Sequence, residues 1–109
     1  MNRVVITGSG TINSLGHSVK ETLANMADGL CGIGPLLFRD VDRLDIKIGG
    51  QVKDFDPITV FNRQQLALYD RVTQFTLIAA KEAIKQSGII FSGELAARSG
   101  VVLGTAGGG

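Results

Sequence analysis

The sequence of 109 residues predicts an α/β fold, because apolar strand-like runs alternate with segments of helical periodicity. Two runs rich in valine and isoleucine, residues 3–7 and 100–104, end in glycine turns. Such runs are typical of strands that are buried on both faces. Apolar residues recur at helical spacing in residues 18–30 and 71–86. The expected order is β, α, β, α, β, with right-handed crossovers.

The first predicted strand, Arg3 to Thr7, leads through a long turn into a helix that begins near Ser18. Ser18 and Glu21 have capping-box spacing, in which the serine oxygen accepts from a first-turn amide and the glutamate reaches back. The apolar residues of this segment lie on one helical face: Val19, Leu23, Met26, Ala27 and Leu30. A glycine at position 29 is a plausible left-handed stop.

The middle of the chain reads as loop, strand and turn before a stronger helix begins. Residues 31–43 are expected to form a loop, since Pro35 does not permit a continued strand ladder. Alternation over residues 46–52 predicts a half-exposed strand, and residues 54–57 predict a turn that starts a short helix. Residues 71–86 then carry a wide apolar stripe, and Gly88 ends that helix.

The composition is globular, with 44% hydrophobic residues, 19% charged residues and a formal net charge of +1. A chain of this length is expected to bury roughly two thirds of its unfolded surface. The sequence has no concentrated basic face and no apolar run near the ~20 residues of a membrane span. Because a strand-like run follows the first residues directly, we expect no secretory segment. The single Cys31 fits a reducing compartment. We therefore expect a cytoplasmic protein that binds neither nucleic acid nor membrane.

The glycines after the first strand raise the alternative of a dinucleotide-binding oxidoreductase. That motif needs a third glycine, so that a helix can approach a pyrophosphate. Here Asn13 stands in its place, which favours a plain tight turn after a strand.

Other candidates for chemistry are isolated. Cys31 follows a helix end whose dipole disfavours a thiolate, so we expect a buried structural residue. His17 has no ligand partner at metal-binding spacing, and we expect it in a surface loop. We expect Arg63, Asp70 and Arg71 to form an ion network at a helix end. No catalytic or metal site is predicted within the chain.

Five blocks occur in a characteristic order and spacing. They are RVVITG at 3–8 with Leu15-Gly16, GIGP at 32–35, VKDFDP at 52–57, DRVTQF at 70–75 and VVLGT at 101–105. Together they resemble the amino-terminal quarter of β-ketoacyl-acyl-carrier-protein synthases of the KAS I/KAS II type. On this resemblance, residues 1–109 are an incomplete amino-terminal ketoacyl synthase domain, part of the amino-terminal half of a thiolase-like five-layer αβαβα fold.

The resemblance implies an acyltransferase of fatty acid biosynthesis that needs no cofactor and acts as a homodimer. It implies decarboxylative Claisen condensation of an acyl thioester with malonyl-carrier protein, with acyl carrier protein as partner. The family's nucleophilic cysteine and its histidines lie beyond residue 109, so Cys31 and His17 do not inherit their roles and this segment alone should be inactive. A non-catalytic partner subunit of chain-length-factor type remains an alternative.

Two departures from the family pattern concern specificity. Gly107 stands where a bulky apolar residue commonly lines the acyl pocket, which suggests a longer pocket and longer acyl chains. Arg63 is the one basic residue in residues 63–69, a stretch that often carries several for the acidic carrier protein. Arg63 is therefore the predicted carrier contact, and steering by this helix should be weak.

Overall fold

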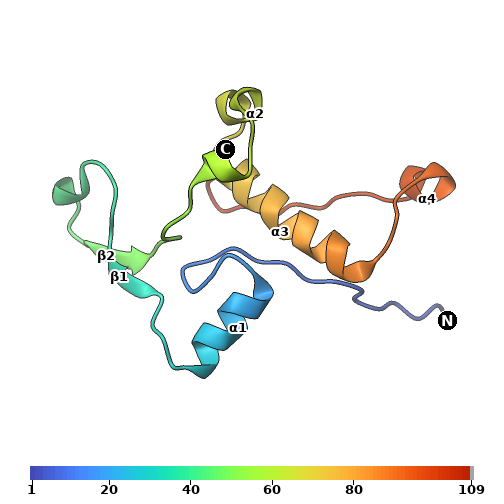
Figure 1. Cartoon of the computed structure of the whole chain (residues 1–109), viewed down its shortest axis with the longest axis horizontal. Helices are drawn as coiled ribbons and strands as arrows, with labels where there is room; N and C mark the ends of the chain where they lie inside the picture. Colours follow the sequence, from blue (N-terminus) through green and yellow to red (C-terminus); the bar gives the residue numbers. More distant parts are fainter. Residues whose placement is uncertain (109) are drawn as a thin grey trace.

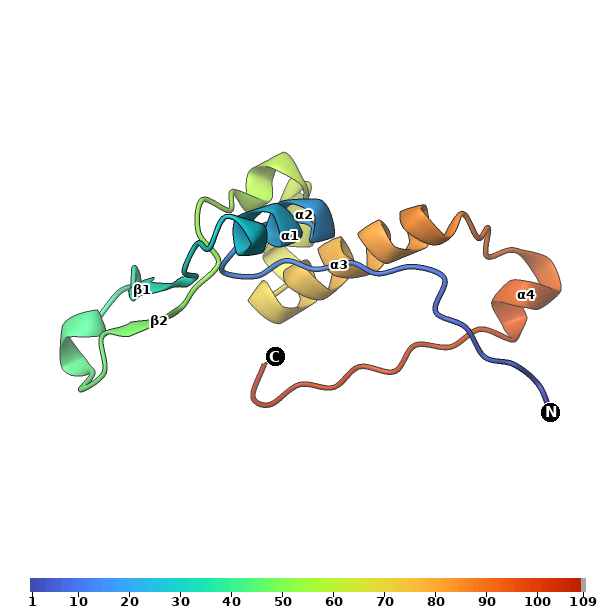
Figure 2. The same ribbon diagram turned by 90° about the horizontal axis from the view of Figure 1, so that it is seen from below.

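A computed structural model describes residues 1–108 of the chain. The longest helix, α3 (Arg71–Ser87), runs through the middle of the molecule, with α1 (Val19–Ala27) near it (Figure 1). Strands β1 (Ile33–Pro35) and β2 (Ile48–Gly50) form a hairpin that projects away from α3 in both views (Figures 1 and 2). The remaining elements are α2 (Arg63–Leu68), α4 (Gly93–Ala97) and the 3₁₀ helices η1 (Val41–Arg43) and η2 (Pro57–Thr59).

Helix α1 confirms the predicted helix and both of its ends. The Ser18 side chain accepts from the backbone N–H of Glu21 at 3.1 Å, as expected of an N-cap. The Glu21 carboxylate, however, accepts from the N–H of His17 at 2.9 Å, one residue before the position that a capping box predicts. At the other end Gly29 has φ +71°, and the N–H of Leu30 reaches the carbonyl of Asn25 to close a Schellman motif.

The hairpin corrects the prediction of a loop throughout residues 31–43. Strand β1 pairs antiparallel with β2, and Pro35 lies opposite Ile48. The ladder continues through the N–H of Leu36, which donates to the carbonyl of Lys47 at 2.9 Å. Backbone N–H groups alternate between the two sides of a strand, so the nitrogen of Pro35 faces the open edge, where a missing donor is tolerated.

Helix α3 confirms the other predicted helix. Asp70 caps its first turn, and Gly88, with φ +66°, follows its last residue. Helix α2 confirms the helix that the family resemblance implies for residues 63–69, and a complete capping box between Asn62 and Gln65 starts it. The short helix α4 was not predicted. Asp56 caps η2, which confirms the predicted turn and short helix after residue 54.

The strands predicted at residues 3–7 and 100–104 are absent from the structure of the described residues. Both segments are extended but carry no strand pairing, and Val4, Ile6 and Val102 are 92%, 93% and 100% exposed. A strand exists only when another strand satisfies its N–H and C=O groups. Within residues 1–108 neither segment has such a neighbour. The predicted β, α, β, α, β order is therefore wrong for these residues.

The chain also buries less surface than its length suggests. Its accessible surface is 8873 Å², whereas a compact monomer of this mass exposes about 5,800 Å². The radius of gyration is 16.8 Å, against about 13 Å for a compact domain of this length. Phe61 is the one apolar residue among those described that is buried, at 4% exposure. The expectation that two thirds of the unfolded chain's surface becomes buried is therefore wrong. The structure buries about half of that surface.

Candidate functional site

Side chains of α3 hold the glycine-rich segment after residue 7 by its backbone. The Glu82 carboxylate, which is half-buried, accepts from the N–H of Thr11 at 2.9 Å and from the N–H of Val19 at 2.8 Å. Gln86 accepts from the N–H of Ser9 at 2.6 Å and from its hydroxyl at 3.1 Å. These bonds fix residues 9–19 along one face of α3.

Two glycines permit this close approach. A methyl group at Gly8 would overlap the carbonyl oxygen of Ala83, and one at Gly10 would overlap the carbonyl oxygen of Ala79. These glycines therefore serve packing against α3. The amides that would have to cradle a pyrophosphate already donate to Glu82 and Gln86, so the geometry argues against the dinucleotide-binding alternative.

Aromatic rings and one cation meet at the N-terminal end of α3. The rings of Phe55 and Phe75 are 5.3 Å apart at 65°, and the ring of His17 meets that of Phe55 edge-on at 6.0 Å. The Arg71 guanidinium lies 5.4 Å from the centroid of Phe55 and 5.0 Å from that of Phe75. The Nε2 atom of His17 is 2.7 Å from the Lys53 carbonyl oxygen, which ties the loop before α1 to the same cluster.

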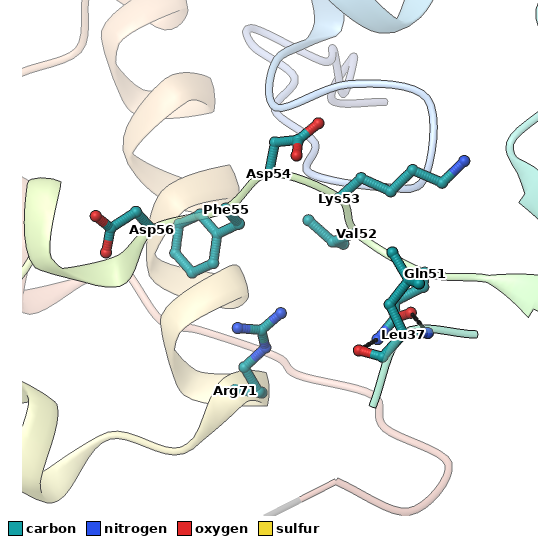
Figure 3. A pocket seen from close by; sticks show the side chains of 8 residues that line it. All are labelled: Leu37, Gln51, Val52, Lys53, Asp54, Phe55, Asp56 and Arg71. Atoms are coloured by element: carbon teal, nitrogen blue, oxygen red, sulfur yellow. Dashed lines mark hydrogen bonds between the residues drawn. The ribbon is translucent and has the colours of Figure 1, made fainter. Parts of the chain in front are cut away.

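Two members of this cluster, Phe55 and Arg71, line an open cavity of about 500 Å³. Figure 3 shows the guanidinium of Arg71 on the same side of the cavity as the ring of Phe55, with the hydrogen-bonded pair Leu37 and Gln51 opposite. The cavity is lined by Leu37, Gln51, Val52, Lys53, Asp54, Phe55, Asp56 and Arg71.

The predicted ion network of Arg63, Asp70 and Arg71 is wrong. Asp70 accepts from the N–H of Thr73 at 2.8 Å. That backbone hydrogen bond, and then the Thr73 side chain, lower the pKa of the Asp70 carboxyl from its ordinary value of 3.8. Arg71 stacks on aromatic rings instead, and the two ion pairs among residues 1–108 are Lys47–Asp42 and Arg98–Glu94.

The two predicted site residues lie on different segments of the described chain. Arg63 is exposed at the first position of α2. Gly107 lies in the final turn, beside Gly108, which contacts Val72 of α3. A Cβ atom at Gly107 would meet nothing within 4 Å. Gly109, the last residue of the predicted glycine turn, lies outside the described residues.

Cys31 and His17, for which no catalytic role is expected, both differ from their predicted settings. Cys31 is exposed, which corrects the expectation of a buried residue. His17 is half-buried between the Lys53 carbonyl and the Phe55 ring, so it is not a free surface histidine. Residues 1–108 hold no group of three or more side chains that is arranged to bind a metal ion. No helix within that range is long and apolar enough to cross a membrane.

Comparison with known proteins identifies the family. The model of the β-ketoacyl synthase N-terminal domain matches residues 1–109, so the chain belongs to the β-ketoacyl synthase family, a family of acyltransferases with a thiolase-like fold. Relatives include the 3-oxoacyl-(acyl-carrier-protein) synthase 2 of Staphylococcus aureus strain N315 and that of Synechocystis sp. strain PCC 6803. Each is 33% identical over 107 residues, which cover 98% of this chain and 26% of the relative. The chain thus spans about a quarter of the length of these relatives.

The aromatic cluster and the Glu82 contacts were missed by sequence reasoning. Phe55 and Arg71 each lie in a block that marks the family resemblance, but the blocks are distant in sequence and nothing in either predicts stacking. The spacing of Arg71 and Phe75, four residues apart on one helix, was the available signal. Glu82 and Gln86 are also four residues apart on α3. They lie beside Ala79 and Ala83, whose small side chains allow the backbone of Gly8 and Gly10 to approach the helix.

Proposed function

We propose that this chain is the amino-terminal part of a 3-oxoacyl-acyl-carrier-protein synthase that condenses an acyl thioester with malonyl-carrier protein in fatty acid biosynthesis. The observation that carries the proposal is the match of the family model across residues 1–109. The printed names of the relatives agree with this activity. Residues 1–109 are then an incomplete domain of a five-layer thiolase-like fold, in line with the large exposed surface and the unpaired extended segments.

In this proposal the chain contributes scaffold rather than reacting groups. Covalent catalysis requires a thiolate activated by a base or by a helix N-terminus. Cys31 follows the C-terminal end of α1 and its sulfur is near the Ile33 carbonyl oxygen at 3.7 Å, so it lacks such an environment. The enolate and the oxyanion that develop during condensation need positioned hydrogen-bond donors. His17 does not supply one, because its Nε2 atom already contacts the Lys53 carbonyl oxygen. In this proposal the catalytic groups therefore lie outside residues 1–109, and the complete enzyme needs no cofactor.

The proposal is tested by a condensation assay with purified acyl- and malonyl-carrier proteins, following release of CO₂ and formation of the β-ketoacyl product. We expect activity from the complete protein, none from residues 1–109 alone, and unchanged activity in the complete Cys31→Ser variant. The chain-length-factor alternative predicts a different result. The complete protein would then be inactive by itself, and condensation would appear only when a second synthase subunit is added. Loss of activity in Cys31→Ser would contradict the assignment of the nucleophile.

Gly107 is proposed to leave space in the wall of the acyl pocket. The absence of any atom within 4 Å of its Cβ position supports room for a larger side chain among the described residues. We expect the complete Gly107→Phe variant to make shorter products than the wild type, since each buried methylene contributes about 0.8 kcal/mol. Gly104→Ala, which also meets nothing within 4 Å, is the control. An identical product profile for wild type and Gly107→Phe would remove Gly107 from the pocket.

Arg63 is proposed to contact the acidic carrier protein. It is exposed and forms no ion pair among residues 1–108, so its charge is accessible. We expect Arg63→Glu to raise the Kd for the carrier by only a few-fold, because an exposed single charge is well screened. Arg98→Glu, which alters an exposed arginine just after the end of α4, is the matched control. A Kd equal to that of the wild type would exclude Arg63 from the interface.

The complete protein is further proposed to be a cytoplasmic homodimer. Native mass spectrometry of the protein purified from its source tests the assembly. A mass of twice one subunit is expected, and a monomer mass would contradict the dimer. Cell fractionation tests the compartment.

A further inference from the structure

A groove lies between α1 and α3, beside the backbone segment that Glu82 and Gln86 hold. The two helices are next to each other in both views (Figures 1 and 2), and the groove has a volume of about 630 Å³. Helix α1 supplies its apolar residues, and α3 supplies most of its polar ones. The groove therefore combines an apolar part with a charged part, as a site for an amphiphilic ligand would.

The charged groups of the groove differ in how far they are engaged. Glu82 is the one acidic residue of the lining, and both of its carboxylate oxygens already accept backbone N–H groups. Lys20 and Lys85 are exposed, and neither forms an ion pair within residues 1–108. Two ammonium groups thus stand against one carboxylate, so a ligand with a single negative charge balances the groove. A phosphate monoester carries nearly two negative charges and exceeds that balance.

Gln86 adds a neutral donor to these two cations. Its Oε1 atom accepts from the N–H of Ser9 at 2.6 Å and from the Ser9 hydroxyl at 3.1 Å. Its Nε2 atom donates to no other group among the described residues. A carboxylate only accepts hydrogen bonds, so a set made of two ammonium groups and one amide N–H suits it.

The apolar part of the groove belongs to α1. Val19 and Leu23 are one turn apart on this helix and both line the groove, and Leu23 is 59% exposed. Met26 continues the same helical face and is also more than half exposed. From Val19 to Met26 this face extends about 10 Å along the helix axis. A strip of that length, with a cation at its side, suits a linear alkyl chain that carries an anionic head.

We propose that the groove between α1 and α3 binds a fatty acid, with its carboxylate paired to Lys20 and Lys85 and its alkyl chain along Val19 and Leu23. The charge and the apolar surface that this ligand needs are both left unengaged by the other described residues. The choice of a fatty acid rests on the proposed function, because hydrolysis of an acyl thioester releases a fatty acid and a thiol. The ligand class, a single-chain amphiphile with one negative charge, rests on the lining residues.

The experiment is photolabelling of the complete protein with a decanoate analogue that carries a diazirine at the end of its alkyl chain. Mass spectrometry then locates the labelled peptides, and we expect a label within residues 19–27. Unlabelled decanoate should compete for this label. Hexanoate should compete about tenfold more weakly, since an open groove buries the four lost methylenes only in part. The uncharged 1-decanol should also compete about tenfold more weakly, because it lacks the carboxylate.

Substitutions at the lysines separate the charged contact from general apolar binding. In the Lys20→Gln/Lys85→Gln double variant, competition by decanoate for the label on α1 should weaken about tenfold. Lys81→Gln is the matched control, because Lys81 is an exposed lysine of α3 that does not line the groove. It should leave the competition unchanged. Labels on all other peptides should be the same in the three proteins.

The remaining outcomes contradict the inference in different ways. No label on α1, or equal competition by decanoate and 1-decanol, would overturn it, and so would equal competition in the double variant and in Lys81→Gln. If the double variant fails to fold, the two single lysine variants decide by the same measurement. A complete protein that condenses acyl thioesters but takes no label on α1 refutes this inference alone. One that takes the label in the expected way but condenses nothing refutes the proposed function and supports the binding site.

Discussion

Helix α3 and the two extended segments, residues 3–7 and 100–104, are both rich in apolar residues, but only α3 adopts regular structure. The helix satisfies its hydrogen bonds within itself, and Asp70 and Gly88 cap its ends. The extended segments expose Val4 and Val102 almost completely and have no neighbouring strand. Helices in this chain therefore depend on local sequence, whereas strands depend on partners that residues 1–108 do not supply.

The segment after residue 7 lies between these two cases. It has no regular structure, yet it is ordered by α3 through Glu82 and Gln86. Contact with a helix can therefore replace a strand ladder, because side-chain oxygens accept the backbone N–H groups that a ladder would use. Substitutions at Gly10 and Glu82 test this account, and substitutions at Asp70 test the local capping of α3.

Adding a methyl group at Gly10 should have the largest effect. Gly10→Ala forces a Cβ atom against the carbonyl oxygen of Ala79, which belongs to a rigid helix. We expect the free energy of unfolding to fall by about 2–3 kcal/mol, the upper range for overpacking. Denaturant unfolding measures it, with Gly100→Ala, where the new atom meets nothing within 4 Å, as control. Equal stability of the two variants would show that this segment does not lie against α3.

Removing the Glu82 carboxylate should have a smaller effect. Glu82→Ala leaves the N–H groups of Thr11 and Val19 without their acceptor. We expect a loss of about 2 kcal/mol in unfolding free energy, since hydrogen bonds to charged groups contribute about 1.5–3 kcal/mol and water replaces part of this. Hydrogen exchange at these two amides should also become faster. Glu94→Ala, which breaks an exposed pair with Arg98, serves as control and should change stability little. Unaltered exchange at Thr11 would contradict the bond.

The cap of α3 should show the smallest effect, through its pH dependence. The folded-state pKa of Asp70 lies below its ordinary value of 3.8, because the charged form accepts from Thr73. The stabilisation is therefore fully present above pH 3.8 and is lost as the pH falls through the lower folded-state pKa. Asp70→Asn should retain a cap but lose this dependence, whereas Asp70→Ala should lose the cap at every pH. Thermal unfolding from about pH 2 to about pH 6 measures this pH dependence of stability. Asp45→Asn, a substitution at an exposed aspartate, is the control. Parallel pH profiles for wild type and Asp70→Asn would contradict the expected role.

The elements predicted correctly are those that nearby residues decide. Ser18 and Gly29 mark the ends of α1, and Gly88 marks the end of α3, because caps and left-handed glycines act within one turn. The prediction of a loop at Pro35 was wrong. The missing N–H of a proline disrupts a strand only where that position faces the paired strand, and the sequence does not show which side faces the partner. The strands at residues 3–7 and 100–104 were predicted from apolar runs alone, and pairing does not follow from such runs.

The family, the two main helices and their stops were determined by the sequence alone, because order of motifs and helical periodicity need no knowledge of distant contacts. Only the tertiary structure revealed why Gly8 and Gly10 are glycines, how Glu82 holds the backbone of residues 11 and 19, and that the Arg71 guanidinium lies against the rings of Phe55 and Phe75. Some of these features join residues far apart in the sequence, such as Thr11 and Glu82, which are 71 positions apart. Contacts over such separations depend on how the elements come together in space, which local propensity does not encode.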